Sequence, residues 1–124
     1  MDAHLIQHAI EAHEVWKDRL RELVDHGRLD RPIEDFAADD RCPFGRWLHG
    51  DAFPRGERDT AEYRRVHACH ARFHMTAGRV AELVSQGRGT DAAHMLVEKG
   101  VFTQASIELL SALMDWKSAR FPGA

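Results

Sequence analysis

The chain has 124 residues, of which 30% are charged and 44% hydrophobic, a composition typical of one soluble globular domain. Its net charge of -3 argues against a nucleic-acid-binding protein, and no apolar run is long enough for a membrane-spanning helix. Two cysteines, Cys42 and Cys69, are too few for a disulfide scaffold, so we expect a cytoplasmic location. The unusual feature of the composition is its nine histidines.

The first predicted element is a helix over residues 2–26, where apolar residues recur at helical spacing. His13 lies within the apolar stripe of this helix. Residues 28–41 contain one proline and several aspartates, and we expect them to form a connection. A short helix is predicted to begin at Pro43, and the glycines and proline of 50–56 interrupt the chain again.

Two further long helices are predicted in the rest of the chain. The first starts at 57–60 and ends at residue 86, and its apolar positions advance in alternating steps of three and four. The second carries its apolar residues over 92–116, with Thr90 or Asp91 as its N-cap and a local kink at Gly100. The expected fold is all-α, an antiparallel four-helix-bundle-type domain of three long helices and a short cysteine-bearing helix.

Four residues in this arrangement are candidate metal ligands. His70 and His74 lie one turn apart on one helix face, where two imidazoles can bind a single ion. His13 lies on the inward face of the first helix. Cys42 precedes the short helix, whose free N–H groups and dipole are expected to lower the pKa of its thiol. The four residues would form a tetrahedral Cys/His3 site suited to Zn²⁺, although each histidine taken alone also fits a hydrogen-bonded core position.

The residues around these candidates are assigned mainly to packing. We expect Trp16, Trp47 and Phe44 to pack the core and to exclude water around the site. Asp40, just before the cysteine, either caps the short helix and orients a ligand imidazole or belongs to a solvated acidic turn. Gly45 is expected to allow a close approach between helices.

Three segments of the sequence resemble the chemoreceptor zinc-binding domain family. They are HEVWKDRL from residue 13, DRCPFGRWLHG from residue 40 and HARFH from residue 70. The resemblance covers about residues 5–118 and implies that 1–124 form one zinc-binding helical domain. It implies a four-helix bundle that binds one Zn²⁺ per chain through His13, Cys42, His70 and His74.

The resemblance also implies a sensory or regulatory protein that is not an enzyme. In such a protein zinc occupancy, or oxidation of the zinc-bound Cys42, controls a chemotaxis or cyclic-di-GMP output. No chemoreceptor signalling helix or diguanylate cyclase domain occurs in these residues, so the output partner is expected either on another chain or in a longer protein. His67 is additional to the family pattern, and it is either an alternative ligand or a surface residue.

Zinc would keep Cys42 as a thiolate, the form that oxidants attack. Oxidation of Cys42, or loss of zinc, is therefore expected to release segment 42–50 from the bundle. A homodimer is also expected, because the first and last helices carry additional apolar residues that could cover a partner: Ile6, Ile10, Val97, Ile107 and Leu110.

Two other classes of protein fit the same helical pattern. A hemerythrin-like or ferritin-like di-iron bundle needs paired carboxylate and histidine motifs, and only Asp91 stands three residues before a histidine. A metal-free interaction bundle would use the histidines for packing alone. A hydrolytic zinc enzyme is not expected, because the His-Glu-x-x-His motif is missing and four protein ligands leave no open position.

Overall fold

The computed structural model describes residues 3–40, 42–50 and 53–120. Over these residues the chain is helical, with no β-strand. The elements in chain order are α1 (Ala3–His26), α2 (Ile33–Ala37), α3 (Pro43–His49), the short 3-10 helix η1 (Arg55–Asp59), α4 (Ala61–Ser85), α5 (Gly89–Leu96) and α6 (Val101–Arg120).

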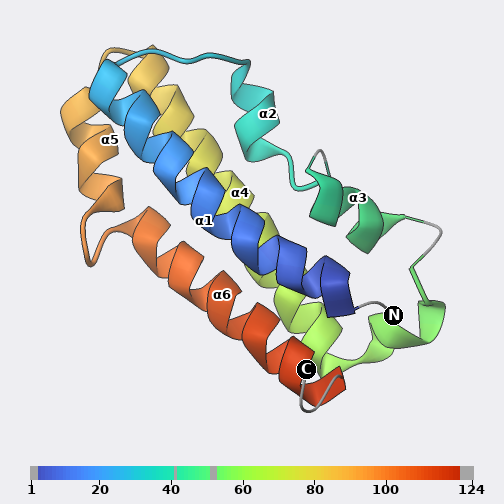
Figure 1. Ribbon diagram of the computed structural model, residues 1–124. Helices are drawn as coiled ribbons and strands as arrows, with labels where there is room; N and C mark the ends of the chain where they lie inside the picture. Colours follow the sequence, from blue (N-terminus) through green and yellow to red (C-terminus); the bar gives the residue numbers. More distant parts are fainter. Residues whose placement is uncertain (1–2, 41, 51–52, 121–124) are drawn as a thin grey trace.

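The three long helices pack side by side, and the segment between α1 and α4 supplies the fourth position of the bundle (Figure 1). Helices α1 and α4 run in the same direction, and α6 runs opposite to both. Helices α2 and α3, which connect α1 to α4 in the chain, run back along the side of this pair that faces away from α6. The all-α bundle is therefore confirmed, with its fourth segment divided into two short helices. The sequence pattern predicted only a connection where α2 forms.

The last part of the chain differs from its prediction. Instead of one kinked helix, the structure has α5 and α6 with a turn over 97–100 between them, and α5 already begins at Gly89, before the predicted N-caps. Gly100 is buried in this turn, and a Cβ atom there would lie 2.3 Å from the carbonyl oxygen of Met95. The prediction was wrong because this glycine fits against the end of α5 rather than within a continuous helix.

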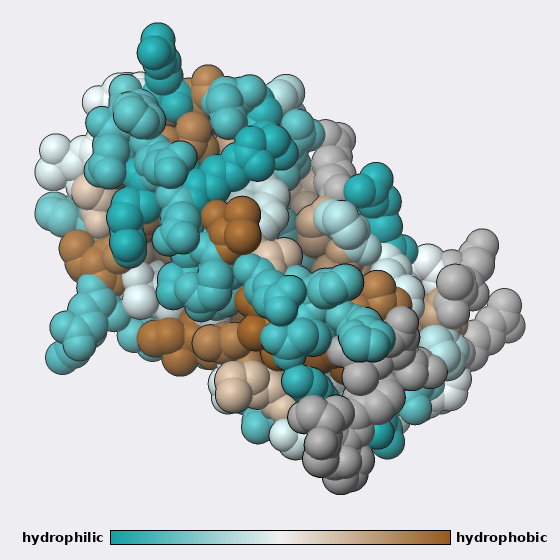
Figure 2. All heavy atoms as spheres, in the orientation of Figure 1, coloured by the Kyte–Doolittle hydropathy of each residue, from teal (hydrophilic) through white to brown (hydrophobic). Residues whose placement is uncertain are grey.

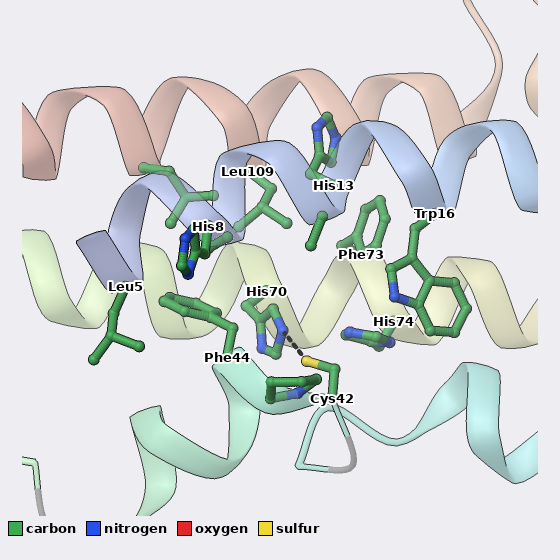
Figure 3. A pocket seen from close by; sticks show the side chains of 14 residues that line it. Leu5, His8, His13, Trp16, Cys42, Phe44, His70, Phe73, His74 and Leu109 are labelled. Atoms are coloured by element: carbon green, nitrogen blue, oxygen red, sulfur yellow. Dashed lines mark hydrogen bonds between the residues drawn. The ribbon is translucent and has the colours of Figure 1, made fainter. Parts of the chain in front are cut away.

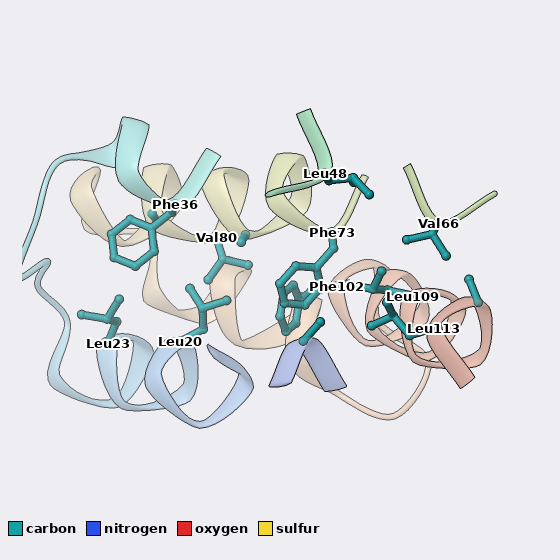
Figure 4. Packing of buried hydrophobic residues seen from close by; sticks show 14 of the residues in the cluster. Leu20, Leu23, Phe36, Leu48, Val66, Phe73, Val80, Phe102, Leu109 and Leu113 are labelled. Atoms are coloured by element: carbon teal, nitrogen blue, oxygen red, sulfur yellow. The ribbon is translucent and has the colours of Figure 1, made fainter. Parts of the chain in front are cut away.

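The core lies between the long helices and is closed on one side by α2 and α3 (Figure 4). Phe73 of α4 and Phe102 of α6 are buried as predicted, with ring centroids 5.2 Å apart. Phe36 of α2 and Leu48 of α3 have no exposed surface, so each short helix is anchored by one large side chain. Both helices that flank the candidate ligand Cys42 are thus fixed to α1 and α4 by core packing.

The face seen in Figure 2 is mainly hydrophilic, with some apolar side chains gathered in a band across it. Ile107 and Met114 of α6 are each 54% exposed, whereas Ile6 of α1, predicted to face a partner, is fully buried in the core. Ile6 therefore belongs to the inward stripe of α1. In the part of the chain that the structure describes, no helix combines the length and apolarity needed to cross a membrane.

Candidate metal centre

Cys42, His70 and His74 form a cluster of potential metal ligands between α3 and α4 (Figure 3). One ligand atom of each residue lies within 4.8 Å of the others. Both histidines are buried, and Cys42 is half-buried. A soft thiolate with two imidazoles is a donor set that suits Zn²⁺.

The two histidines of the cluster are placed by the helical repeat of α4. Their rings lie one turn apart with centroids 4.7 Å from each other, on the face of α4 that is covered by α1 and the α2–α3 segment. Burial lowers the pKa of His70 to about 3, with a smaller contribution from His74, and burial lowers the pKa of His74 as well. Both imidazoles are therefore neutral at pH 7, as metal binding requires.

Cys42 is positioned as the N-cap of α3. Its Sγ atom accepts a hydrogen bond from the backbone N–H of Gly45 at 3.2 Å and lies 3.4 Å from Nε2 of His70. Pro43 follows as the first helical residue, where its missing N–H costs nothing. The placement at the start of the short helix is as predicted.

The expected lowering of the thiol pKa by that placement is present but is outweighed by burial. Burial raises the pKa of Cys42 more than the hydrogen bond from Gly45 and the other nearby N–H groups lower it. The start of a two-turn helix therefore does not make this thiol a thiolate by itself. A bound cation would supply the missing stabilisation of the thiolate.

His74 is oriented by α2. Its Nδ1 atom donates a hydrogen bond to the carbonyl oxygen of Phe36 at 2.9 Å, which leaves Nε2 free as a ligand atom. Trp16 of α1 contacts the same imidazole edge-on, with ring centroids 5.5 Å apart. Trp16 thus packs beside the cluster, and Phe36 is a supporting residue that the sequence patterns missed. The only hint was one aromatic residue among acidic ones in the expected connection.

The approach of α2 to α4 depends on a small residue. A Cβ atom at Gly78 of α4 would lie 2.5 Å from the Cβ of Ala37. Gly78 therefore permits the close packing that brings the carbonyl of Phe36 to His74. Its role could not be read from a lone glycine in a helical pattern.

His13, the fourth predicted ligand, lies outside the cluster. Its imidazole is buried and points away from the other three residues, toward α6, where Nε2 forms a hydrogen bond with Oγ of Ser106 (Figure 3). It nevertheless borders the same cavity as Cys42, His70 and His74, a space of about 290 Å³. The structure thus brings three of the four predicted ligands together and places the fourth at the wall of the adjoining cavity.

The remaining predicted neighbours divide between the cavity and the core. Phe44 contacts the ring of His70 edge-on at 5.2 Å, whereas Trp47 packs against Phe53 at 4.8 Å in the core beyond α3. Gly45 is buried, and a Cβ atom there would lie 1.8 Å from the carbonyl oxygen of Asp39. Its close approach is therefore made with the preceding turn, not with another helix.

Asp40 and His67 lie outside the three-residue cluster. Asp40 is exposed, and its neighbour Asp39 lies 3.4 Å from Nε2 of His49. His67 is half-buried and stacks edge-on against His49 with centroids 4.8 Å apart. These acidic and imidazole groups form a separate contact between α3 and α4.

The sequence matches the family model described as the chemoreceptor zinc-binding domain over residues 13–81, more than half of the chain. This confirms the resemblance found in the sequence motifs. The matched region begins at His13 and includes all three residues of the cluster, while α5 and α6 lie outside it. No curated protein and no solved structure matches the chain.

Proposed function

The chain belongs to the chemoreceptor zinc-binding domain family, and we propose on this basis that it is a sensory domain that responds to zinc or to oxidants. The observation that carries the proposal is the cluster of Cys42, His70 and His74, whose ligand atoms lie within 4.8 Å of one another. The family is a regulatory and not a catalytic one. We therefore assign no catalytic residue.

One Zn²⁺ per chain would be held by Cys42, His70 and His74, with His13 as the fourth ligand. The donors fit the ion, because the imidazoles are neutral and the cysteine is half-buried beside them. The bound ion would stabilise the thiolate of Cys42. His13 borders the same cavity, and in our proposal its imidazole turns about its side-chain bonds to bind the ion.

A redox response would start at the same cysteine. In our proposal the Cys42 thiolate attacks one oxygen of hydrogen peroxide and the O–O bond breaks. The hydroxyl stays on sulfur, which is oxidised to a sulfenic acid, and the other oxygen leaves as hydroxide. The cysteine then no longer serves as a thiolate ligand. Helix α3 follows Cys42 directly, so loss of this ligand would loosen segment 42–50, as would loss of zinc.

The output is proposed to pass to a chemoreceptor or a diguanylate cyclase, on another chain or in the same longer protein. A homodimer is proposed to form through one face of α6, which carries Ile107, Leu110 and Met114 at helical spacing. Two of these three side chains are more than half exposed.

A di-iron bundle is less well supported than a zinc domain. The cluster of potential ligands among the described residues contains one thiol and two imidazoles but no carboxylate. Di-iron sites of helical bundles are built from bridging carboxylates. The donor set therefore favours zinc.

The proposal is tested by the metal content of the purified protein. We expect about one zinc per chain in the wild type, and loss of zinc in Cys42→Ala and His70→Ala because each variant removes one donor of the cluster. Cys69→Ala and His49→Ala are the matched controls, since both residues lie outside the cluster. Iron at about two per chain would support the di-iron class, and zinc retained by both ligand variants would contradict the proposed site.

A further inference from the structure

A buried hydrogen bond outside the ligand cluster joins the first long helix to the last. It connects Nε2 of His13 in α1 with Oγ of Ser106 in α6, and these residues are only 4% and 1% exposed. The other nitrogen, Nδ1, is buried without a hydrogen-bond partner, 3.6 Å from a carboxylate oxygen of Glu14. The one hydrogen bond that the imidazole makes therefore holds it toward α6.

The same imidazole stands at the wall of the cavity that adjoins Cys42, His70 and His74. A ring nitrogen that shares a hydrogen bond with a hydroxyl has no lone pair available for a metal. Binding of Nε2 to an ion in the cluster and its bond to Ser106 thus exclude each other, so Ser106 opposes metal binding when Nε2, and not Nδ1, is the ligand atom. The cavity of about 290 Å³, lined mostly by apolar side chains, leaves space for the ring to move.

We propose that Ser106 competes with the metal ion for His13 and that this exchange links metal occupancy to α6. The inference rests on the proposed function, because it requires a metal at the cluster. Without metal, Ser106 holds His13 toward α6. With metal bound, His13 turns into the cavity and the buried hydroxyl of Ser106 loses its partner across the α1–α6 seam.

The position of Ser106 makes α6 the element that would respond. Ser106 lies on the buried face of α6 between Phe102 and Leu109, and these two side chains are packed in the central core. A change at this hydroxyl therefore acts on the packing of α6 against α1. Because α6 lies outside the region of the family match, no sequence motif pointed to this residue.

The experiment compares zinc affinity, measured by competition with a metal-binding dye, in wild type and Ser106→Ala. We expect Ser106→Ala to bind zinc about fivefold more tightly, the change that follows from removing one competing neutral hydrogen bond. His13→Ala should bind more weakly, and adding Ser106→Ala to it should change nothing further. Ser111→Ala, which removes an exposed hydroxyl from the same helix, should have wild-type affinity.

Hydrogen exchange provides a second readout that a merely structural serine would not affect. Addition of zinc should change the protection of the α6 amides around Ser106 in the wild type but not in His13→Ala. Weaker or unchanged zinc binding in Ser106→Ala would overturn the proposed competition between Ser106 and the metal. So would a fivefold gain in zinc affinity when Ser106→Ala is added to His13→Ala. If the competition fails but His70→Ala still loses its zinc, the proposed function remains supported. A wild-type protein that contains no zinc would overturn both the competition and the proposed function.

Discussion

The two clustered histidines of α4 differ in whether their Nδ1 atom makes a hydrogen bond. Nδ1 of His74 donates to the carbonyl oxygen of Phe36, whereas Nδ1 of His70 is buried without a hydrogen-bond partner. Both imidazoles have a lowered pKa because of burial, so both are neutral at pH 7. The carbonyl of α2 thus gives His74 a structural role beside its proposed metal ligation.

This difference predicts unequal costs for removing the two imidazoles from chelator-treated protein. His74→Ala leaves the carbonyl of Phe36 without its donor, which costs about 1–3 kcal/mol. His70→Ala loses ring packing and the long contact of Nε2 with Sγ of the half-buried Cys42 at 3.4 Å, but no hydrogen bond at Nδ1. We expect His74→Ala to lower the free energy of unfolding in urea by about 1–3 kcal/mol more than His70→Ala. Equal values would contradict a stabilising role for the bond to Phe36.

At the scale of elements, the short helices α2 and α3 hold the site together. They form the fourth segment of the bundle and present the carbonyl of Phe36 and the thiol of Cys42 to α4. Each helix has only one or two turns, so neither would be stable in isolation. Their positions depend on the buried side chains that anchor them and on the close contact at Gly78.

Substitution of Gly78 tests this close contact. Gly78→Ala would place a Cβ atom 2.5 Å from the Cβ of Ala37. Such overpacking lowers the free energy of unfolding by about 1–3 kcal/mol, whereas the better helix propensity of alanine raises it by about 1 kcal/mol. We expect a lower melting temperature and weaker zinc binding, because displacement of α2 removes the support of His74. The control is Gly89→Ala in α5, where a Cβ atom meets nothing within 4 Å. A gain of stability in Gly78→Ala would show that α2 does not pack tightly on α4.

At the scale of the whole molecule, α6 has two distinct faces. One packs on α1 and α4, while the other carries Ile107, Leu110 and Met114 and is partly exposed. Ion pairs from α6 to α4, Glu108 with Arg72 and Asp115 with Arg65, connect the two helices at the surface. A dimer through the apolar face would bring two copies of α6 together, and α6 is the helix on which the His13–Ser106 exchange is proposed to act.

The dimer is tested by the molar mass in solution, measured by light scattering after size-exclusion chromatography. The wild type should have twice the mass of the chain, and Ile107→Asp should be monomeric because a buried unpaired charge opposes association. Met75→Asp is the control, since Met75 is 63% exposed but lies on α4. A monomeric wild type, or a dimer in Ile107→Asp, would contradict an interface on this face.

The sequence by itself determined the features that depend on local order. Helical periodicity placed α1 and α4, the spacing of His70 and His74 placed both on one face, and Pro43 marked the start of α3. These patterns suffice because helical geometry relates neighbours three and four residues apart without reference to the rest of the fold. The family motifs are equally local, and the family match confirms them.

Only the tertiary structure decided the features that depend on contacts between distant segments. Three such features are the hydrogen bond from His74 to the carbonyl of Phe36, the hydrogen bond between His13 and Ser106, and the turn at Gly100 that separates α5 from α6. Each of these contacts depends on how closely two elements pack. Burial also reversed the expected pKa shift of Cys42, because the cost of moving a thiolate out of water exceeds the gain from nearby N–H groups. Side-chain direction and depth of burial are properties of the packed molecule, so no spacing in the sequence encodes them directly.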